Sequence, residues 1–151
     1  MKREPKTKPK VIGIANWKTR VLRDGTDTVM LHVEDVGTIG LYFMDPGQET
    51  IVFSTEPEDD GTADEWYGGI HEFYYILVGE FTVWWGKDAS KVRSKNAEKL
   101  TIKEGECVHY PQGWKYMVKN TGKVPGTFFW GASAAPKGTK PRENEPIREI
   151  K

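Results

Sequence analysis

One stretch, residues 105–120, constrains the fold of this chain more than any other part of it. Its sequence, GECVHYPQGWKYMVKN, reads as two short strands joined by a tight reversal. Pro111 sets φ at the turn, and Gly113 can take the positive φ that other residues resist. Because side chains alternate along a strand, Tyr116 and Val118 share one face of the second strand. The stretch therefore predicts two β-strands and a turn that requires glycine.

The spacing of several residues in this stretch matches a known pattern. Gly105, Pro111, Gly113 and Asn120 fit G-x5-P-x-G-x2-H-x3-N. The stretch thus resembles the second signature of the cupin superfamily. Tyr116 stands where that signature has a metal-binding histidine. The resemblance therefore implies the fold but does not supply the usual metal ligand.

The first cupin signature, G-x5-H-x-H-x3,4-E-x6-G, is present only in its second half. Glu72 and Gly79 have the E-x6-G spacing. The two histidine positions are occupied by Trp66 and Gly68 with the short spacer, or by Glu65 and Tyr67 with the long one. Neither spacer supplies a histidine, so this half of the usual metal site is also missing.

The resemblance covers residues 38–131 and implies an all-β, single-domain cupin, a double-stranded β-helix or jelly-roll barrel of the RmlC-like type. In cupins the signature glutamate and histidine project into one end of the barrel. The resemblance therefore implies that Glu72 and Tyr116 point into a shared cavity. Cupin barrels commonly pair through their outer sheets, which implies a homodimer.

The strand pattern supports an all-β fold independently of the signatures, because short β-branched and aromatic runs recur between Gly/Pro turns. Strands are expected over residues 11–17, 28–33, 38–44, 50–54, 71–78, 81–85, 100–102 and 127–130. The runs 71–78 and 81–85 are expected to pair as a hairpin. We expect no helix. The charged run 87–99 predicts an extended hairpin tip, and residues 55–69 predict a solvated acidic loop.

The length of 151 residues indicates one domain. We expect a flexible basic arm at residues 1–10, the barrel at 11–133 and a polar C-terminal tail at 134–151. The net charge of zero gives no indication of a nucleic-acid partner. No apolar run approaches the roughly 20 residues that cross a bilayer, so no membrane partner is expected. The single cysteine, Cys107, fits a cytoplasmic protein and is predicted to be a small buried hydrophobe.

Glu72 and Tyr116 are the candidate catalytic residues. Desolvation in an apolar, aromatic pocket favours the neutral form of a carboxyl group, which suits general acid–base chemistry. The simpler alternative is that Glu72 only hydrogen-bonds the Tyr116 hydroxyl and holds the barrel closed. Aromatic residues near the two signatures are predicted to contact a ligand: Tyr74, Trp85, Tyr110 and Trp114.

A metal site is a second possibility, built from His71, Glu72 and His109, with Glu65 and Tyr116 as further candidate ligands. Imidazoles with a carboxylate suit a divalent transition metal. Adjacent residues on a regular strand face opposite ways, so joining His71 or His109 to Glu72 requires a bulge or a changed register.

Three functions therefore remain open from the sequence. The first is a metal-independent barrel that binds a small organic molecule and performs proton transfer of the isomerase, lyase or decarboxylase type. The second is a metal-dependent oxygenase or lyase with unusual ligands. The third is a non-enzymatic metabolite-binding module. The cofactor is accordingly none or a divalent transition metal, and the expected partners are a small organic molecule and a second copy of the chain.

Overall fold

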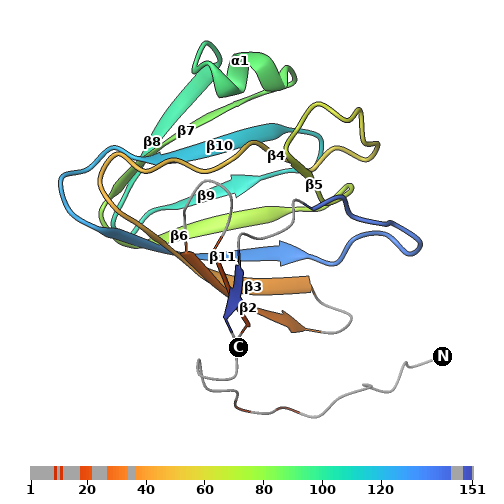
Figure 1. Cartoon of the computed structure of the whole chain (residues 1–151), viewed down its shortest axis with the longest axis horizontal. Helices are drawn as coiled ribbons and strands as arrows, with labels where there is room; N and C mark the ends of the chain where they lie inside the picture. The colour runs from red at the N-terminus through yellow and green to blue at the C-terminus, as the bar shows by residue number, and fades with distance from the viewer. Residues whose placement is uncertain are drawn as a thin grey trace.

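The computed structural model describes residues 9, 11, 18–21, 27–33, 37–143 and 148–150, with side chains described at 9, 11 and 37–143. Within these residues the fold is mostly β, with two sheets packed face to face as in a jelly roll (Figure 1). This confirms the predicted fold class. No helix of the described residues is long and apolar enough to cross a membrane.

The larger sheet has seven strands. Their order across the sheet is β12 (Arg148–Ile150), β1 (Lys18–Val21), β2 (Asp27–Val33), β3 (Gly37–Met44), β11 (Gly126–Ser133), β6 (Glu72–Val78) and β9 (Cys107–Tyr110). The smaller sheet has five strands, in the order β5 (Glu65–Trp66), β4 (Phe53–Ser54), β10 (Lys115–Asn120), β7 (Glu80–Gly86) and β8 (Glu98–Lys103). The inward faces of the two sheets share one aromatic-rich core.

The predicted hairpin between residues 71–78 and 81–85 is wrong. Strand β6 belongs to the larger sheet, whereas β7 belongs to the smaller one and pairs with β8 and β10. Gly79, at φ 100°, lets the chain turn the corner between the sheets. A Cβ at this position would lie 3.1 Å from the Gly126 Cα, so the corner is also tightly packed.

The Pro-x-Gly reversal at residues 111–113 likewise carries the chain between the two sheets. It leads from β9 in the larger sheet to β10 in the smaller one. The alternation of side chains is the same whichever strand lies alongside. The sequence pattern therefore located the strands without indicating their partners.

The charged run 87–99 contains a short helix, α1 (Ala89–Arg93), where none was expected. Asp88 caps it, because its carboxylate accepts a hydrogen bond from the Ser90 backbone N–H at 2.9 Å. Val92 is fully buried and packs in a small cluster with Trp84 and Met117 on the outer face of the smaller sheet. Five residues are too few to show a helical period, which is why the pattern missed it.

The C-terminal segment contributes to the fold. Strand β12 pairs with β1 at one edge of the larger sheet, and Arg142 exchanges backbone hydrogen bonds with Trp66 at 2.8 and 2.9 Å. Apart from residues 9 and 11, the predicted basic arm and the predicted strand at 11–17 lie outside the described residues.

Candidate functional site

Glu72 opens β6 and points into the barrel. Glu72 and Tyr74 on this strand are 5% and 1% exposed, whereas Phe73 and Tyr75 between and beyond them are 40% and 42% exposed. Glu72 lies opposite Tyr110 of β9 in an unbroken register. The alternation therefore places the Glu72 carboxyl among buried aromatic rings, on the face that the sequence pattern predicted.

Tyr116 points into the barrel from the facing sheet. It is fully buried and lies in one cross-strand row of the smaller sheet. The pairings that define this row are Glu65 with Phe53, Phe53 with Tyr116, and Tyr116 with Trp85. Glu65, which the sequence placed in a solvated loop, is 1% exposed in this row.

The two sides meet through Tyr110. Its ring stacks on that of Tyr116 with a centroid separation of 4.0 Å and an interplanar angle of 18°. Tyr74 meets Tyr110 edge-on at 4.9 Å and Tyr116 at 6.2 Å. We call the group Glu72, Tyr74, Tyr110 and Tyr116 the interior site. Its side chains are almost completely shielded from solvent.

The electrostatics of the interior site favour neutral groups. Burial, and secondarily the charge of Glu65, raises the pKa of Glu72 to about 8. Burial, reinforced by Glu72, raises the pKa values of Tyr74 and Tyr110 well above the ordinary phenol value. At pH 7 Glu72 is thus a carboxylic acid that can donate a proton, surrounded by neutral phenols.

Several polar atoms of the interior site have unused hydrogen-bonding capacity. Glu72 Oε2 and the hydroxyls of Tyr110 and Tyr116 find no hydrogen-bond partner among the described residues. A buried polar atom left unsatisfied costs about 1–3 kcal/mol. The Glu72–Tyr116 hydrogen bond of the simpler alternative is therefore not formed. Three such atoms in one aromatic interior indicate a place that accommodates polar atoms from outside the chain.

The two predicted tryptophans lie close together at the edge of this region. Trp85 is only partly buried and packs against the core, and its ring meets that of Trp114 edge-on at 5.0 Å and 88°. The Lys87 ammonium lies 4.7 Å from the Trp114 ring centroid. Trp85 neighbours Tyr116 in the sheet register. This pair therefore lies between the interior site and the surface.

The predicted metal ligands do not come together as a set of three. His71 and His109 lie side by side on the outer face of the larger sheet, while Glu72 points inward. The β6–β9 register is regular from Glu72 to Tyr75, so the bulge that the set requires is missing. Among the described residues no group of three or more His, Cys, Asp or Glu side chains could hold a metal ion. A protonated carboxyl among phenols is a donor set that does not suit a divalent transition metal in the interior.

Cys107 is exposed, and the prediction that it is buried is wrong. Val108 and Tyr110 are the buried residues of β9, and Cys107 and His109 alternate with them on the outside. The alternation of side chains along β9 already indicated that Cys107 faces outward.

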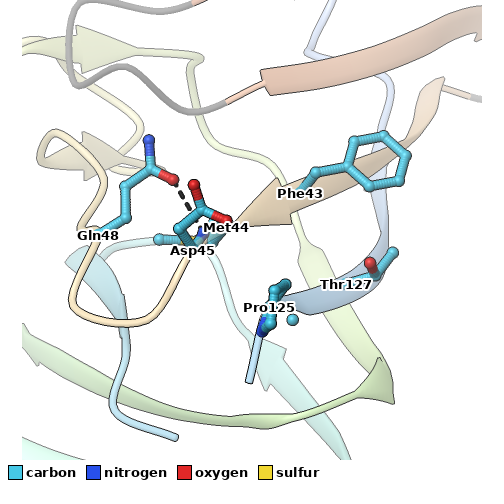
Figure 2. Close-up of a pocket in the computed structure, with 7 residues that line it drawn as sticks. Phe43, Met44, Asp45, Gln48, Pro125 and Thr127 are labelled. Atoms are coloured by element: carbon cyan, nitrogen blue, oxygen red, sulfur yellow. Dashed lines mark hydrogen bonds between the residues drawn. The ribbon is translucent and has the colours of Figure 1, made fainter. Parts of the chain in front are cut away.

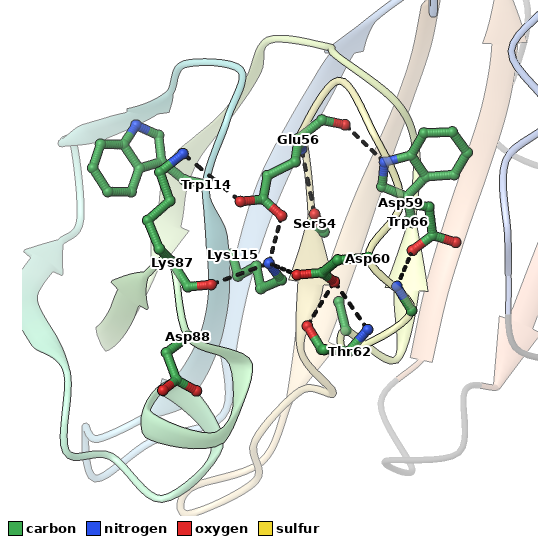
Figure 3. A network of polar contacts seen from close by, with 12 residues as sticks. Ser54, Glu56, Asp59, Asp60, Thr62, Trp66, Lys87, Asp88, Trp114 and Lys115 are labelled. Carbon is green, nitrogen blue, oxygen red and sulfur yellow. Dashed lines mark hydrogen bonds and ion pairs between the residues drawn. The ribbon is translucent and has the colours of Figure 1, made fainter.

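A network that the sequence did not predict fixes the acidic segment 55–69 (Figure 3). The Lys115 side chain, only 1% exposed, donates hydrogen bonds to Glu56 and to Asp60 at 2.7 Å. Arg142 pairs with Asp59 at 2.7 Å. The segment is therefore held by ion pairs and is not a freely solvated loop. A lysine directly before the apolar run Tyr116–Val118 was the only local signal for it.

A surface cavity of about 190 Å³ is lined by residues of the turn after β3 and the start of β11 (Figure 2). Asp45 and Gln48 stand on one side of it, and Pro125 and Thr127 on the other (Figure 2). The Gln48 side chain is held by the Asp45 backbone N–H at 3.0 Å. None of the predicted site residues lines this cavity.

This chain is similar to known proteins in its three-dimensional structure. No family model matches the sequence, and no curated protein matches it. Among solved structures, the Cnp3 cupin domain of Schizosaccharomyces pombe is 19% identical, with a TM-score of 0.54, over 72% of this chain and 64% of that one.

Two further structures extend the comparison. A predicted oxalate decarboxylase from Thermotoga maritima is 18% identical, with a TM-score of 0.57, over 83% of this chain and 99% of that one. CENP-C from Drosophila melanogaster, solved bound to CAL1, is 13% identical, with a TM-score of 0.61, over 82% of this chain and 85% of that one. At these identities the likeness concerns the fold.

Proposed function

We propose, for a chain that has the cupin fold, that the interior site binds a small organic molecule and transfers a proton to or from it. The observation that carries the proposal is the set of buried, unsatisfied polar atoms on Glu72, Tyr110 and Tyr116. A ligand with polar atoms at these positions supplies hydrogen bonds that these atoms do not find among the described residues.

Glu72 is the proton-transferring residue in this proposal. With a pKa of about 8, it holds its proton at pH 7 and loses it without great cost, as general acid–base catalysis requires. Tyr116 donates a hydrogen bond to the ligand from the facing sheet, and Tyr74 and Tyr110 enclose it. Trp85 and Trp114 contact the ligand as it enters. Isomerisation, elimination and decarboxylation all use such a proton transfer. One structural neighbour is a predicted oxalate decarboxylase, which supports including decarboxylation in this group.

The test follows proton transfer directly. The protein is incubated in D₂O with a panel of keto acids, hydroxy acids and sugars, and NMR follows exchange of ligand C–H for deuterium. We expect one class to exchange with the native protein. Glu72→Gln, which imitates the neutral acid in shape, should keep binding and lose exchange. Glu72→Ala should lose both. Tyr75→Phe, on the outer face of the same strand, is the matched control.

Two outcomes contradict the proposal. Exchange that persists in Glu72→Gln removes Glu72 from the chemistry. Binding by the native protein without exchange, unchanged in Glu72→Ala, supports a non-enzymatic binding module with its ligand elsewhere.

The second candidate is an interaction module. The outer face of β6 exposes Phe73, Tyr75 and Leu77 by 40–42%, and Phe73 packs on Phe129 of β11 at 6.0 Å. A contiguous apolar patch of this kind is typical of a protein-binding surface. One structural neighbour, CENP-C, was solved with a protein partner. We propose that a second copy of the chain covers this patch.

Light scattering after size exclusion tests the dimer. Leu77→Lys should shift the native protein from dimer to monomer, because it buries a charge in the apolar contact. Val124→Lys, at an exposed position in the loop before β11, should leave the mass unchanged. A native protein that is monomeric at high concentration contradicts this proposal.

A further inference from the structure

His71 and His109 form a close pair on the outer face of the larger sheet. Their nearest ring nitrogens, Nδ1 of His71 and Nε2 of His109, are 3.1 Å apart. The rings are nearly parallel, at 11°, with centroids 5.3 Å apart. Both side chains are exposed, and β9, which carries His109, is an edge strand of this sheet. Within a single chain, a solute can therefore reach this pair.

The backbone fixes both residues of the pair. The His71 N–H donates to the Ser133 side chain at 2.9 Å, and its carbonyl accepts from the Ser133 N–H at 2.8 Å. His109 lies opposite Phe73 in the β6–β9 register. The two imidazoles are thus presented by three hydrogen-bonded strands, and only side-chain rotation remains free.

The spacing matches that of two imidazoles on one metal ion. Metal–nitrogen bonds are about 2.0–2.1 Å long. Adjacent ligands at tetragonal to tetrahedral angles then place their nitrogens about 2.8–3.4 Å apart. The observed 3.1 Å falls within this interval. To bind one ion between them, the imidazoles give up their mutual hydrogen bond and rotate until both nitrogen lone pairs point at the ion.

We propose that His71 and His109 form a two-imidazole binding site for a late first-row divalent ion, with Cu²⁺ bound most tightly. Cu²⁺ stands highest in the general affinity order and favours nitrogen and oxygen ligands in tetragonal geometry. Because the described residues contain no third ligand at this point, water completes the coordination. The site is separate from the interior site, since Glu72 points through the sheet to the other face.

The experiment titrates the full chain with Cu²⁺ by calorimetry and by electron paramagnetic resonance, in a buffer that does not coordinate the metal. The Cys107→Ser background prevents the exposed thiol from reducing the ion. We expect one equivalent to bind, with a spectrum that shows two equivalent nitrogen ligands. His71→Ala and His109→Ala should each weaken binding by about tenfold or more, equal to at least ~1.4 kcal/mol.

His32→Ala is the matched control, because His32 is the remaining histidine of the chain. It should bind Cu²⁺ as tightly as the parent. Glu72→Gln should also bind normally, which separates this site from the proposed function.

The proposal is overturned if the double variant His71→Ala/His109→Ala binds Cu²⁺ as tightly as the parent. A spectrum with a single nitrogen ligand, or a loss of affinity in His32→Ala, also overturns it. In each of these cases the pair is only a hydrogen bond between two side chains.

Discussion

Two buried polar groups of the molecule differ in how their charge is met. Lys115, on the outer face of the smaller sheet, is 1% exposed and contacts Glu56 and Asp60 (Figure 3). Burial alone would lower the pKa of Lys115, but hydrogen bonds to these carboxylates raise it. Lys115 in turn holds the pKa of Asp60 well below its usual range. Both partners stay charged.

Glu72 shows the opposite arrangement. It is also buried, but its close neighbours are phenols and the like charge of Glu65, and burial raises its pKa to about 8. Glu72 is therefore neutralised by its own proton and not by a counter-ion. Burial alone therefore does not identify a functional residue. A buried charge with its partners in place holds two segments together, whereas a buried acid with unused hydrogen-bonding capacity is suited to binding and proton transfer.

The largest effect should come from removing the partners of Lys115. Glu56→Gln/Asp60→Asn leaves a buried ammonium group without a counter-charge, which should lower the free energy of unfolding by about 3–5 kcal/mol. Urea denaturation measures it. Glu80→Gln, whose partner Lys103 is 3.7 Å away and exposed, is the control and should change stability by less than about 0.5 kcal/mol. If the two changes lowered the free energy of unfolding equally, the ion pairs of Lys115 would not hold the two segments together.

A second prediction concerns the pH dependence of stability. The pKa of Glu72 rises from an ordinary 4.5 to about 8 on folding, so the native state binds the extra proton between these values. Stability should therefore fall as pH rises from about 5 to 8, by up to about 1.4 kcal/mol per pH unit from this group. Above that range its contribution levels off.

Glu72→Gln should flatten this part of the stability profile, because the amide does not titrate. Denaturation midpoints of the native protein and the variant, measured from pH 5 to 9, give the difference directly. Parallel profiles would show that Glu72 is solvated or paired in solution, and the contrast with Lys115 would disappear.

The smallest effect is expected at the tyrosine hydroxyls. Tyr116→Phe and Tyr110→Phe remove buried hydroxyls that have no hydrogen-bond partner in the described part of the chain, so each should be neutral or stabilising by up to about 1 kcal/mol. Tyr67→Phe is the control, because the Tyr67 hydroxyl donates a hydrogen bond to Glu65. That change should cost about 1–3 kcal/mol. A comparable loss in Tyr116→Phe would indicate a hydrogen bond that closes the interior site.

Much of the fold followed from the sequence because its signals are local. The spacing of Gly105, Pro111 and Gly113 carried the resemblance that implied a jelly roll, and the alternation around Glu72 gave the buried face of β6. Strand partners were not local. The corner at Gly79 was read as a hairpin because a turn looks alike whether or not the strands on either side pair.

The interior site was only partly predictable. The positions of Glu72 and Tyr116 came from spacing, but the contact between Tyr110 and Tyr116 depends on packing between two sheets. The ion pairs of Lys115 join residues more than fifty positions apart, a separation over which no periodic pattern extends. Their partners lay in a segment whose composition suggested only solvation.

The pairing of β12 with β1 affects how the chain is made. It joins the earliest and the latest of the described strands, so the larger sheet acquires its outermost partner only after nearly all the intervening chain has been synthesised. Until then β1 presents open backbone donors and acceptors, which invite strands of other chains. Removing residues 148–150 would make that temporary exposure permanent, and aggregation during expression would be its most direct sign.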